Sequence, residues 1–436
     1  MLPPGPRTPK LWQTYRYLAH PKPYTRHLMA RFGPITRYRM VQGTGVAVTS
    51  PELAREVFAT DPSHFDTLPI TGTAFGPRSV IATAGEEHRR QRKLLNPRFH
   101  GARMKAFLAT MQRVVDRHLS SWKPGLTLTM ADVTQDLTLD VILETVFGAR
   151  PGLDRSRARG ILQALVRAFT PSLLAVPWLS NTPYPPWRRY HAARATFDTW
   201  VDELVAERQA DGDLGDDILG VLLEARYDDG SPIAAGELRD HLFTLLAAGH
   251  ETTAVALAWA VYFLGRDRAA LGSLRAALDA LGADASPEAL TKLPYLEAVC
   301  AESLRVEPIV TDVVRVCRVP VRIGEYTVPA GEAIAVLLVG ILSDARTYPE
   351  PDRFRPDRFL ERRPTATEFL PFGGGSRRCL GAAFAEAELA IALGTIASKW
   401  NLELTDDRPE RSVRRNITMG PERGVRVRVV SSRSVS

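Results

Sequence analysis

Cysteine is scarce in this sequence, with only three among 436 residues. An odd number of cysteines cannot form a closed disulfide framework, which excludes a disulfide-stapled secreted scaffold. The N-terminus also lacks the apolar stretch of about 7–15 residues that a signal peptide requires. No internal repeat or low-complexity stretch is present, and the chain is 45% hydrophobic and 24% charged. Such a composition excludes a disordered or collagen-like protein, and together these absences predict a globular, cytoplasmic protein.

Long apolar runs are few as well. The longest extends from His241 to Gly265, about the length of a membrane span. His250 and Glu251 lie at its middle, where ionisable groups are costly in lipid. A helix that is apolar on all sides is also what the centre of a large protein requires. We therefore predict a buried core helix in this run and no membrane anchor.

Lysine is rare, whereas arginine is abundant. The 56 basic residues comprise seven lysines and 49 arginines, and the net charge is +7. Arginine suits the bidentate recognition of carboxylates and phosphates, so anionic ligands are expected. The basic charge balance also allows a non-enzymatic protein that binds nucleic acid. No recognition motif of that kind is present, so we expect no nucleic-acid partner.

Periodicity and turn residues predict a mainly helical chain with a small strand-rich portion and no clear linker. Ser50 and Pro51 have the positions of an N-cap and a first helical residue. The elements expected are a hairpin at 35–40 and 45–49, a helix at 51–59, a long loop at 60–84, helices through most of 86–305, strands within 313–340, coil at 344–378, a helix at 380–398 and a strand at 425–430.

One cysteine has unusual surroundings. Residues 371–381 read Pro-Phe-Gly-Gly-Gly-Ser-Arg-Arg-Cys-Leu-Gly, so Cys379 follows a glycine-rich loop and precedes a predicted helix. Helix N-terminal amides and nearby arginines favour a thiolate, and glycines let a backbone approach a flat partner closely. A packed free cysteine is the plain alternative. A phosphate loop is disfavoured, because the Gly-Lys-Ser/Thr ending is missing.

This segment resembles a known family. Phe372, Gly375, Arg377, Cys379 and Gly381 match the pattern Phe-x-x-Gly-x-Arg-x-Cys-x-Gly. It is the haem-binding signature of the cytochrome P-450 haem-thiolate monooxygenases. The resemblance implies that Cys379 is the axial ligand of the haem iron, that Phe372 packs near the sulfur and that Arg377 pairs with a haem propionate. Gly373 and Gly381 are further haem-binding residues that it implies.

A second motif lies within the long apolar run. Residues 248–253, Ala-Gly-His-Glu-Thr-Thr, are similar to the oxygen-activation motif of the same family. Gly249 leaves room for O2, and the Thr252 hydroxyl can bond the carbonyl of Ala248 and loosen the helix. Glu251 can feed protons toward the oxygen as a general acid. Without the resemblance, a polar pair facing a buried water is an equal reading. A zinc site is excluded, because His-Glu-x-x-His needs a second histidine at Ala254.

Charged residues elsewhere complete the resemblance. Glu302 and Arg305 have the spacing of an ion pair on one helix face; alone, such a pair is usually a weak surface feature. In the family this pair is buried and joined by a downstream arginine, here Arg358, in a structural role. His88, Arg92 and Arg315 correspond to further partners of the haem propionates. A solvated basic helix is the plain alternative for the segment around His88.

Other roles follow only from the resemblance. The distal pocket is expected to be mostly apolar. Its lining residues are expected to be Phe75, Val80, Ala247, Ala248, Val310, Val313, Ile417 and Thr418. A basic surface that steers an acidic electron donor is expected at Arg89, Arg90, Lys93, Arg98, Arg377 and Arg378. Asp312 falls in a segment that is usually apolar, and it either turns outward or binds a polar group of the substrate. Cys300 and Cys317 lack special surroundings and are read as core or strand residues.

These motifs occur in family order over about residues 10–430 and identify the chain as resembling the soluble, bacterial-type members. They imply the mainly α cytochrome P-450 fold, an α prism with haem between a long central helix and the cysteine loop. One domain spans 1–436, strand-rich at about 30–60 and 310–345 and helical at about 86–305 and 380–398. The implied reaction inserts one oxygen atom of O2 into an apolar fatty acid, terpenoid, steroid or polyketide. Thr252 and Glu251 deliver protons.

The resemblance also implies haem b as cofactor, and electrons that come ultimately from NAD(P)H through an external reductase with a ferredoxin or flavodoxin. The expected protein is a cytoplasmic monomer with a small apolar substrate. The alternative is a haem-thiolate peroxygenase or isomerase that needs no electron donor. The Glu251–Thr252 pair disfavours it, because peroxide-driven members often lack this pair.

Overall fold

The computed structural model describes residues 2–99, 102–148, 150, 154–170, 173, 176–282 and 285–433, with the backbone alone at 98, 99, 102, 103 and 177. The chain divides into two compact units. The first comprises Met1–Phe65, Met111–Leu137 and Thr252–Ser436. The second comprises Asp66–Thr110 and Thr138–Glu251.

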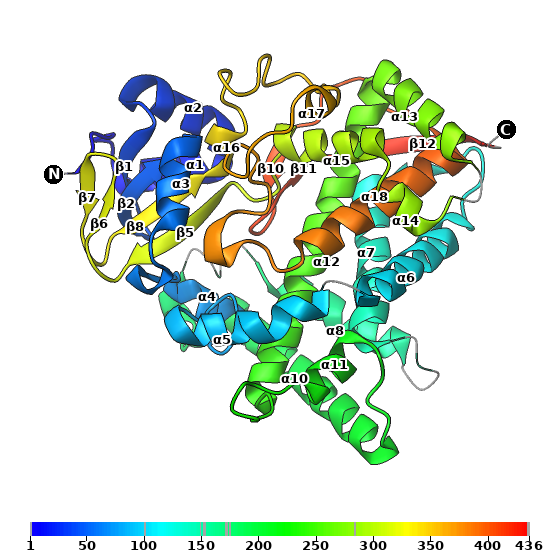
Figure 1. Ribbon diagram of the computed structural model, residues 1–436, viewed down its shortest axis with the longest axis horizontal. Coiled ribbons are helices and arrows are strands. Elements are labelled where there is room, and N and C mark those ends of the chain that lie inside the picture. The colour runs from blue at the N-terminus through cyan, green and yellow to red at the C-terminus, as the bar shows by residue number, and fades with distance from the viewer. Residues whose placement is uncertain are drawn as a thin grey trace. The chain divides into compact units, whose positions relative to one another are not determined.

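A five-stranded sheet organises the N-terminal part of the first unit (Figure 1). Its strands, in spatial order, are β1 (Ile35–Met40), β2 (Gly43–Val48), β8 (Ala333–Leu337), β5 (Asp312–Cys317) and β3 (Phe65–Asp66). β2 and β8 run parallel, whereas β1 pairs with β2 and β5 with β8 in antiparallel fashion. All five residues of β8 are buried, as expected for a central strand of alanine, isoleucine, valine and leucine. The predicted hairpin and the strand-rich segment at 313–340 are thus confirmed.

Three helices precede or flank this sheet: α1 (Lys10–Ala19), α2 (Pro21–Phe32) and α3 (Pro51–Ala59). α3 begins as predicted, because the Ser50 hydroxyl accepts a hydrogen bond from the Leu53 N–H at 3.3 Å and Pro51 holds the first position. Val57 on this helix packs with Val46, Val48 and Ile334 in one apolar cluster. α3 is therefore anchored on the sheet.

The rest of the first unit carries the smaller sheets and the C-terminal helices. A three-stranded sheet has the order β4-β12-β9, and β6–β7 and β10–β11 are two-stranded. The strands are β4 (Thr127–Thr129), β6 (Val321–Ile323), β7 (Tyr326–Val328), β9 (Trp400–Leu404), β10 (Ser412–Arg414), β11 (Met419–Pro421) and β12 (Arg426–Ser432). The helices are α13 (Arg268–Leu281), α14 (Pro287–Leu290), α15 (Pro294–Val306), α16 (Leu338–Ile341), α17 (Arg358–Glu361) and α18 (Ala382–Lys399).

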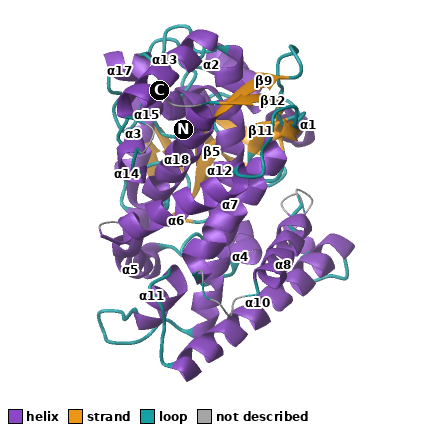
Figure 2. Ribbon diagram, turned by 90° about the vertical axis from the view of Figure 1, so that its right-hand side faces the viewer, coloured by secondary structure: helices purple, strands orange, loops and turns teal. Residues whose placement is uncertain are grey.

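The second unit is almost entirely helical, and α8 and α10 lie side by side in it (Figure 2). Its own helices are α4 (Pro69–Phe75), α5 (Gly85–Leu95), α8 (Arg155–Ala168), α10 (Pro185–Asp211) and α11 (Ile218–Glu224). α6 (Ala102–Leu119), α7 (Met130–Phe147) and α12 (Ala235–Arg266) continue from one unit into the other. Short 3-10 turns lie at Pro62–His64, Asn96–Phe99, Pro177–Leu179 and Gly375–Arg377.

The prediction of an unstructured loop over 60–84 is wrong in part, because α4 lies within it. Pro69 occupies the first turn, where a proline costs no hydrogen bond, and Gly76 ends the helix at a φ of 96°. Ala74 and Phe75 are buried. Tertiary burial thus stabilises a seven-residue helix whose sequence shows too short a pattern to predict.

The long apolar run forms α12, a single helix of 32 residues. Ala254 to Leu264 are all buried, which confirms the buried core helix. Among the described residues, no helix is long and apolar enough to cross a membrane.

Candidate functional site

The loop that carries Cys379 is shaped by glycine and closed by a backbone hydrogen bond. Gly373 and Gly375 have φ values of 67° and 66°, a left-handed conformation that favours glycine. The Cys379 N–H donates to the Phe372 carbonyl at 2.9 Å. The bond holds Phe372 beside the cysteine, and α18 begins three residues after Cys379, at Ala382.

The loop also packs closely on α3. A Cβ at Gly374 would lie 2.6 Å from the Phe58 ring, and one at Gly375 would lie 3.0 Å from the Phe58 carbonyl oxygen. Sequence reasoning assigned these glycines to the approach of a flat partner. In the structure, Gly374 and Gly375 are also required because a side chain at either position would press against Phe58. The sequence did not indicate this contact with Phe58.

The three cysteines differ sharply in environment. Cys379 is exposed, whereas Cys300 on α15 and Cys317 at the end of β5 are buried. Burial raises the pKa of the Cys317 thiol to about 11 and raises the pKa of Cys300 well above its usual value. Buried, protonated thiols are poor metal ligands, so the interpretation of Cys300 and Cys317 as core residues is confirmed.

Two arginines lie close together near this loop within the first unit. Arg315, on β5, is half-buried, and Arg377 lies in the 3-10 turn before Cys379. Loss of hydration, and then repulsion from Arg377, lowers the pKa of Arg315 to about 10. Two guanidinium groups that repel each other in a dry setting favour binding of a carboxylate. The structure thus brings together two of the predicted propionate partners.

The other two predicted propionate partners lie on α5 in the second unit. His88 is buried and Arg92 is half-buried, one helical turn apart. The side-chain spacing predicted from the sequence is therefore present on one side of this helix.

The basic character expected of the outer side of α5 is largely neutralised. Arg89 pairs with Glu86 at 3.1 Å. Arg90 pairs with Asp229 at 3.1 Å and Lys93 with Asp228 at 2.7 Å. The side chain of Arg98 lies outside the described residues. Asp228 and Asp229 are distant from α5 in the sequence, so the expectation of a basic surface on α5 did not include their negative charges.

The Ala-Gly-His-Glu-Thr-Thr segment lies in α12, which continues through it as regular helix. Ala247, Ala248, Gly249, Glu251 and Thr252 are half-buried. A Cβ on Gly249 would lie 3.3 Å from Ile142 Cδ1 of α7. The absence of a side chain at Gly249 thus lets α7 approach α12 closely, and the role of this glycine in leaving room for O2 stays a prediction.

Two threonines of α7 contact carbonyls of α12 on either side of Thr252. Thr138 Oγ1 donates to the His250 carbonyl at 3.0 Å, and Thr134 Oγ1 donates to the Ala254 carbonyl at 2.9 Å. Both threonines are fully buried, and neither was predicted. Burial lowers the pKa of His250 to about 4, so this imidazole is neutral at pH 7.

A buried carboxyl group was also missed. Glu388 of α18 is buried and hydrogen-bonded to Thr253, the residue after Thr252. Its Oε1 has no hydrogen-bond partner among the described residues, and burial raises its pKa well above the usual value. Burial therefore favours the protonated, neutral form of this carboxyl group. The sequence signal was one acidic residue in the apolar stretch that follows Ala387.

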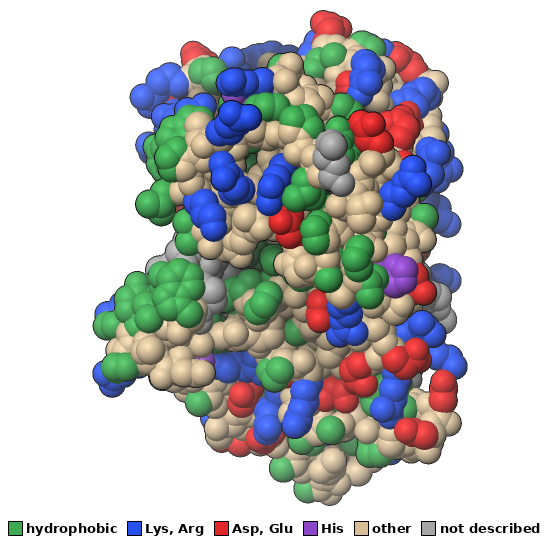
Figure 3. Space-filling model, turned by 90° about the vertical axis from the view of Figure 1, so that its left-hand side faces the viewer, with side chains coloured by type: hydrophobic (Ala, Val, Ile, Leu, Met, Phe, Trp, Pro, Cys, Tyr) green, Lys and Arg blue, Asp and Glu red, His purple; other side chains and the backbone are tan. Residues whose placement is uncertain are grey.

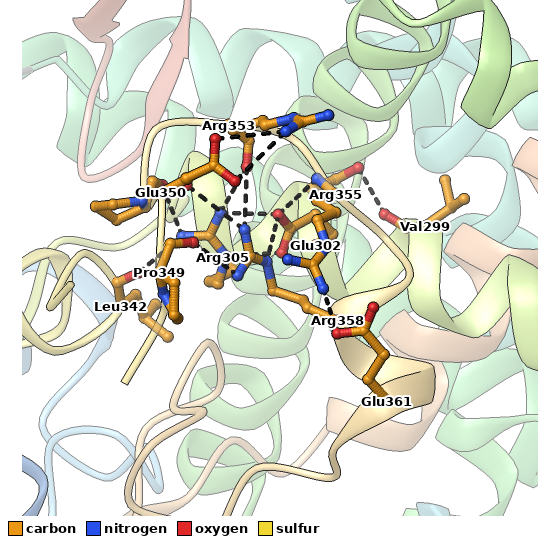
Figure 4. A network of polar contacts seen from close by, with 12 residues as sticks. Val299, Glu302, Arg305, Leu342, Pro349, Glu350, Arg353, Arg355, Arg358 and Glu361 are labelled. Carbon is orange, nitrogen blue, oxygen red and sulfur yellow. Dashed lines mark hydrogen bonds and ion pairs between the residues drawn. The ribbon is translucent and has the colours of Figure 1, made fainter. Parts of the chain in front are cut away.

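The predicted charged triad is assembled and deeply buried (Figure 4). Arg305 donates to Glu302 through Nε at 2.7 Å and through Nη2 at 2.8 Å. Arg358 Nε and the Arg355 N–H donate to Glu302 Oε1 at 3.0 and 2.8 Å. The remaining Arg305 donors reach the carbonyls of Leu342, Pro351 and Arg353. The triad thus fixes the coil that leads toward the cysteine loop.

Within the second unit, one predicted pocket residue belongs to an aromatic cluster. The Phe75 ring lies 5.7 Å from Phe169 and 6.0 Å from Phe243, and Tyr190 also contacts Phe169 and Phe243. Val80 is half-buried.

Within the first unit, the structure brings two predicted pocket segments together. The Met419 N–H donates to the Ile309 carbonyl at 2.9 Å, so Thr418 and Ile417 lie beside the segment that holds Val310 and Val313. Thr418 is buried, whereas Ile417, Val310 and Val313 are half-buried.

Asp312 is half-buried, and two protein hydroxyl groups contact its carboxylate. The Tyr17 hydroxyl and the Thr311 hydroxyl both donate to Asp312 Oδ1, the latter at 2.6 Å. Burial and the charge of Asp312 raise the pKa of Tyr17 well above its usual value, so the phenol remains a donor. Asp312 is thus engaged with α1.

Comparison with known proteins agrees with the site. The sequence model of the family Cytochrome P-450 matches residues 3–427. The chain belongs to the cytochrome P-450 family, which makes it a haem monooxygenase that uses O2 and electrons from a reductant.

Individual relatives are bacterial. Cytochrome P-450 138 of Mycobacterium tuberculosis is 33% identical over 98% of this chain and 96% of its own length. Cytochrome P-450 135A1 of the same species is 32% identical over 99% and 96%. A cyanobacterial protein solved with retinoic acid bound, CYP120A1, has a TM-score of 0.88 and 25% identity, over 99% of both chains. The haem domain of cytochrome P450DA has a TM-score of 0.87 and 27% identity, over 99% of this chain and 98% of that one. The mainly α cytochrome P-450 fold is thereby confirmed.

Proposed function

We propose that this cytochrome P-450 holds its haem through the Cys379 thiolate and oxygenates apolar substrates. The observation that carries the proposal is the Cys379 loop, in which an exposed cysteine is fixed by its bond to Phe372 and precedes a helix. A haem bound through a thiolate supplies the activation of O2. Arg315 and Arg377 fit a haem propionate, because both are cationic and Arg315 is poorly hydrated. His88, Arg92, Ala248, Gly373 and Gly381 complete the proposed haem-binding set.

The chain's own acid–base residues are proposed to be Glu251 and Thr252. Both are half-buried on α12, so each can exchange protons with water and still face a dry site. Thr252 Oγ1 would hold a proton donor near the reacting oxygen, and the Glu251 carboxyl would supply protons to it. The neutral His250 between Gly249 and Glu251 does not serve as an acid at pH 7, because its pKa is about 4.

The proposed substrate is a small apolar molecule of the fatty acid, terpenoid, steroid or polyketide class. The predicted lining residues are mostly apolar, and Asp312 is engaged by Tyr17 and Thr311. The structural neighbour with bound retinoic acid, an apolar carboxylic acid, supports this class. We assign to the lining Phe75, Val80, Ala247, Ala248, Val310, Val313, Ile417 and Thr418.

We further propose that the cofactor is haem b and that both units form one catalytic domain in a cytoplasmic monomer. Electrons would come from NAD(P)H through a separate reductase with a ferredoxin or flavodoxin. Because Arg89, Arg90 and Lys93 are paired with acids, the exposed Arg378 next to Cys379 is the better site for electrostatic steering of that donor.

The test is the absorption spectrum of the reduced protein with carbon monoxide, for the wild type, Cys379→Ala and the control Cys317→Ala. We expect a strongly red-shifted Soret band in the wild type and the control, and its loss in Cys379→Ala. A Soret band at the neutral-ligand position in the wild type would contradict the thiolate assignment. Turnover with peroxide but not with a reductase would favour the peroxygenase alternative.

A further inference from the structure

The first helix of the chain is amphipathic, but its faces are oriented opposite to those of an ordinary surface helix. α1 (Lys10–Ala19) turns a polar face toward the protein and an apolar face toward solvent. Its buried residues are Gln13, Thr14 and Tyr17. Its exposed apolar residues are Leu11 (75%), Trp12 (42%), Tyr15 (63%) and Leu18 (36%). Single exposed apolar residues are ordinary, but a contiguous set on one helix face indicates an interaction surface.

The buried polar face fixes this orientation. The Gln13 amide donates to the Thr8 carbonyl at 2.7 Å and accepts from the Arg39 N–H at 3.0 Å. Thr14 Oγ1 accepts from the Val41 N–H at 3.0 Å. Turning α1 to bury its leucines would break these bonds and the Tyr17 contact with Asp312. Because the bond to Thr14 holds the exposed Val41 beside α1, it extends the apolar surface.

The charged residues of the N-terminal segment that contains α1 are all cationic. The first 51 residues of the sequence contain eight Lys and Arg and no Asp or Glu. Lys22, Arg26 and Arg37 pair with acids from later in the chain. Arg7 and Lys10 are exposed, and the Arg16 guanidinium lies over the Trp12 ring at 5.6 Å.

Figure 3 looks onto the side of the molecule on which β1, β2, β6 and β7 lie in Figure 1. Lys and Arg side chains, in blue, are spread over its upper half together with hydrophobic side chains, in green, and fewer Asp and Glu side chains, in red. In the N-terminal segment itself, the exposed apolar residues of α1 occur together with cationic residues and with no acidic residue of the same segment.

We propose that α1 is a docking surface for an anionic lipid bilayer. A helix of ten residues is too short to span a membrane, so it lies in the plane of the bilayer surface. Leu11 and Leu18 enter the acyl boundary, and Trp12 and Tyr15 occupy the headgroup level that such rings favour. Arg7, Lys10 and Arg16 face lipid phosphates. This peripheral contact is distinct from a membrane anchor and is independent of the chemistry at Cys379.

The experiment is cosedimentation of the purified, haem-loaded protein with sucrose-filled vesicles. One set contains phosphatidylcholine alone and the other contains added phosphatidylglycerol. We expect binding to the anionic set that weakens with salt. Removing two apolar contacts by Leu11→Ser with Tyr15→Ser should lower the partition coefficient at least ~10-fold. Leu360→Ser, at a leucine that is 49% exposed on α17, is the matched control and should bind as the wild type does.

A second readout locates the contact. Bromine-labelled lipid should quench tryptophan fluorescence in the wild type and quench less in Trp12→Phe, with sedimentation retained. Absence of binding to phosphatidylglycerol vesicles would overturn the proposal, as would equal binding by the wild type and the Leu11/Tyr15 variant. A wild-type dimer that becomes monomeric in that variant would assign the surface to a second copy of the chain and overturn the lipid assignment.

Discussion

Glu302→Gln should destabilise the protein strongly, although it replaces only one carboxylate oxygen by an NH2 group and hardly changes the size or shape of the side chain. The Glu302 carboxylate is fully buried between Arg305 and Arg358 and accepts four hydrogen bonds. An amide retains one acceptor oxygen but directs an NH2 group toward guanidinium donors. At least one bond to Arg305 is lost, and two buried cations remain without a carboxylate.

The magnitude follows from these contacts. A hydrogen bond to a charged group contributes about 1.5–3 kcal/mol, and breaking one partner of a buried pair costs about 3–5 kcal/mol. Backbone carbonyls of Leu342, Pro351 and Arg353 still accept from Arg305, which limits the loss. We therefore expect the free energy of unfolding to fall by ~3–5 kcal/mol.

The assay is urea unfolding followed by far-ultraviolet circular dichroism, with Glu350→Gln as the matched control. Glu350 lies in the same network, but its side chain is exposed and reaches Arg353 only at 3.4 Å (Figure 4). Its loss should cost less than ~1 kcal/mol. Equal effects of the two substitutions would refute the reasoning, because burial is the feature that distinguishes them.

Three further substitutions test the site. In thermal melts, Glu388→Gln should gain stability relative to the wild type as the pH rises from 5 to 8. Because the pKa of Glu388 is raised in the folded state, the wild type loses stability above the unfolded pKa, at no more than ~1.4 kcal/mol per pH unit, whereas a glutamine does not titrate. Parallel stability curves for the two proteins would contradict a protonated Glu388. Arg315→Gln should speed haem transfer to apomyoglobin ~10–100-fold, the loss of one charge-assisted bond, and an unchanged rate would remove Arg315 from the haem site. Arg378→Glu should slow reduction by a ferredoxin more than Arg89→Glu does, because Arg89 is already paired with Glu86, and the reverse order in stopped-flow measurements would place the donor on α5.

Local signals in the sequence were sufficient for some elements. Ser50 and Pro51 predicted the start of α3 because both act on the first turn alone. The hairpin followed from alternation and glycines within 15 residues. The Cys379 loop was recognisable because its signature is a fixed spacing in one short segment. In each case the responsible contacts lie within a few residues along the chain.

Contacts between distant segments account for what was missed. Asp312 was ambiguous in the sequence because its partner Tyr17 lies 295 residues away. The acids that neutralise Arg90 and Lys93 come from positions 135 or more residues later. α4 needed tertiary burial of Phe75, and β4 needed pairing with β12. Composition and periodicity contain no information about such pairings.

The polar residues within the apolar run of α12 show how both kinds of information combine. The sequence placed His250 and Thr253 in a buried helix without partners, which is costly. In the structure, the His250 carbonyl accepts a hydrogen bond from Thr138, and the Thr253 side chain is hydrogen-bonded to Glu388. Both partners lie outside α12. Successive helical residues point about 100° apart, so these outer contacts fix the rotation of the turn between them. Thr252, which follows Glu251 and precedes Thr253, is therefore oriented by neighbours that take no part in the chemistry proposed for it.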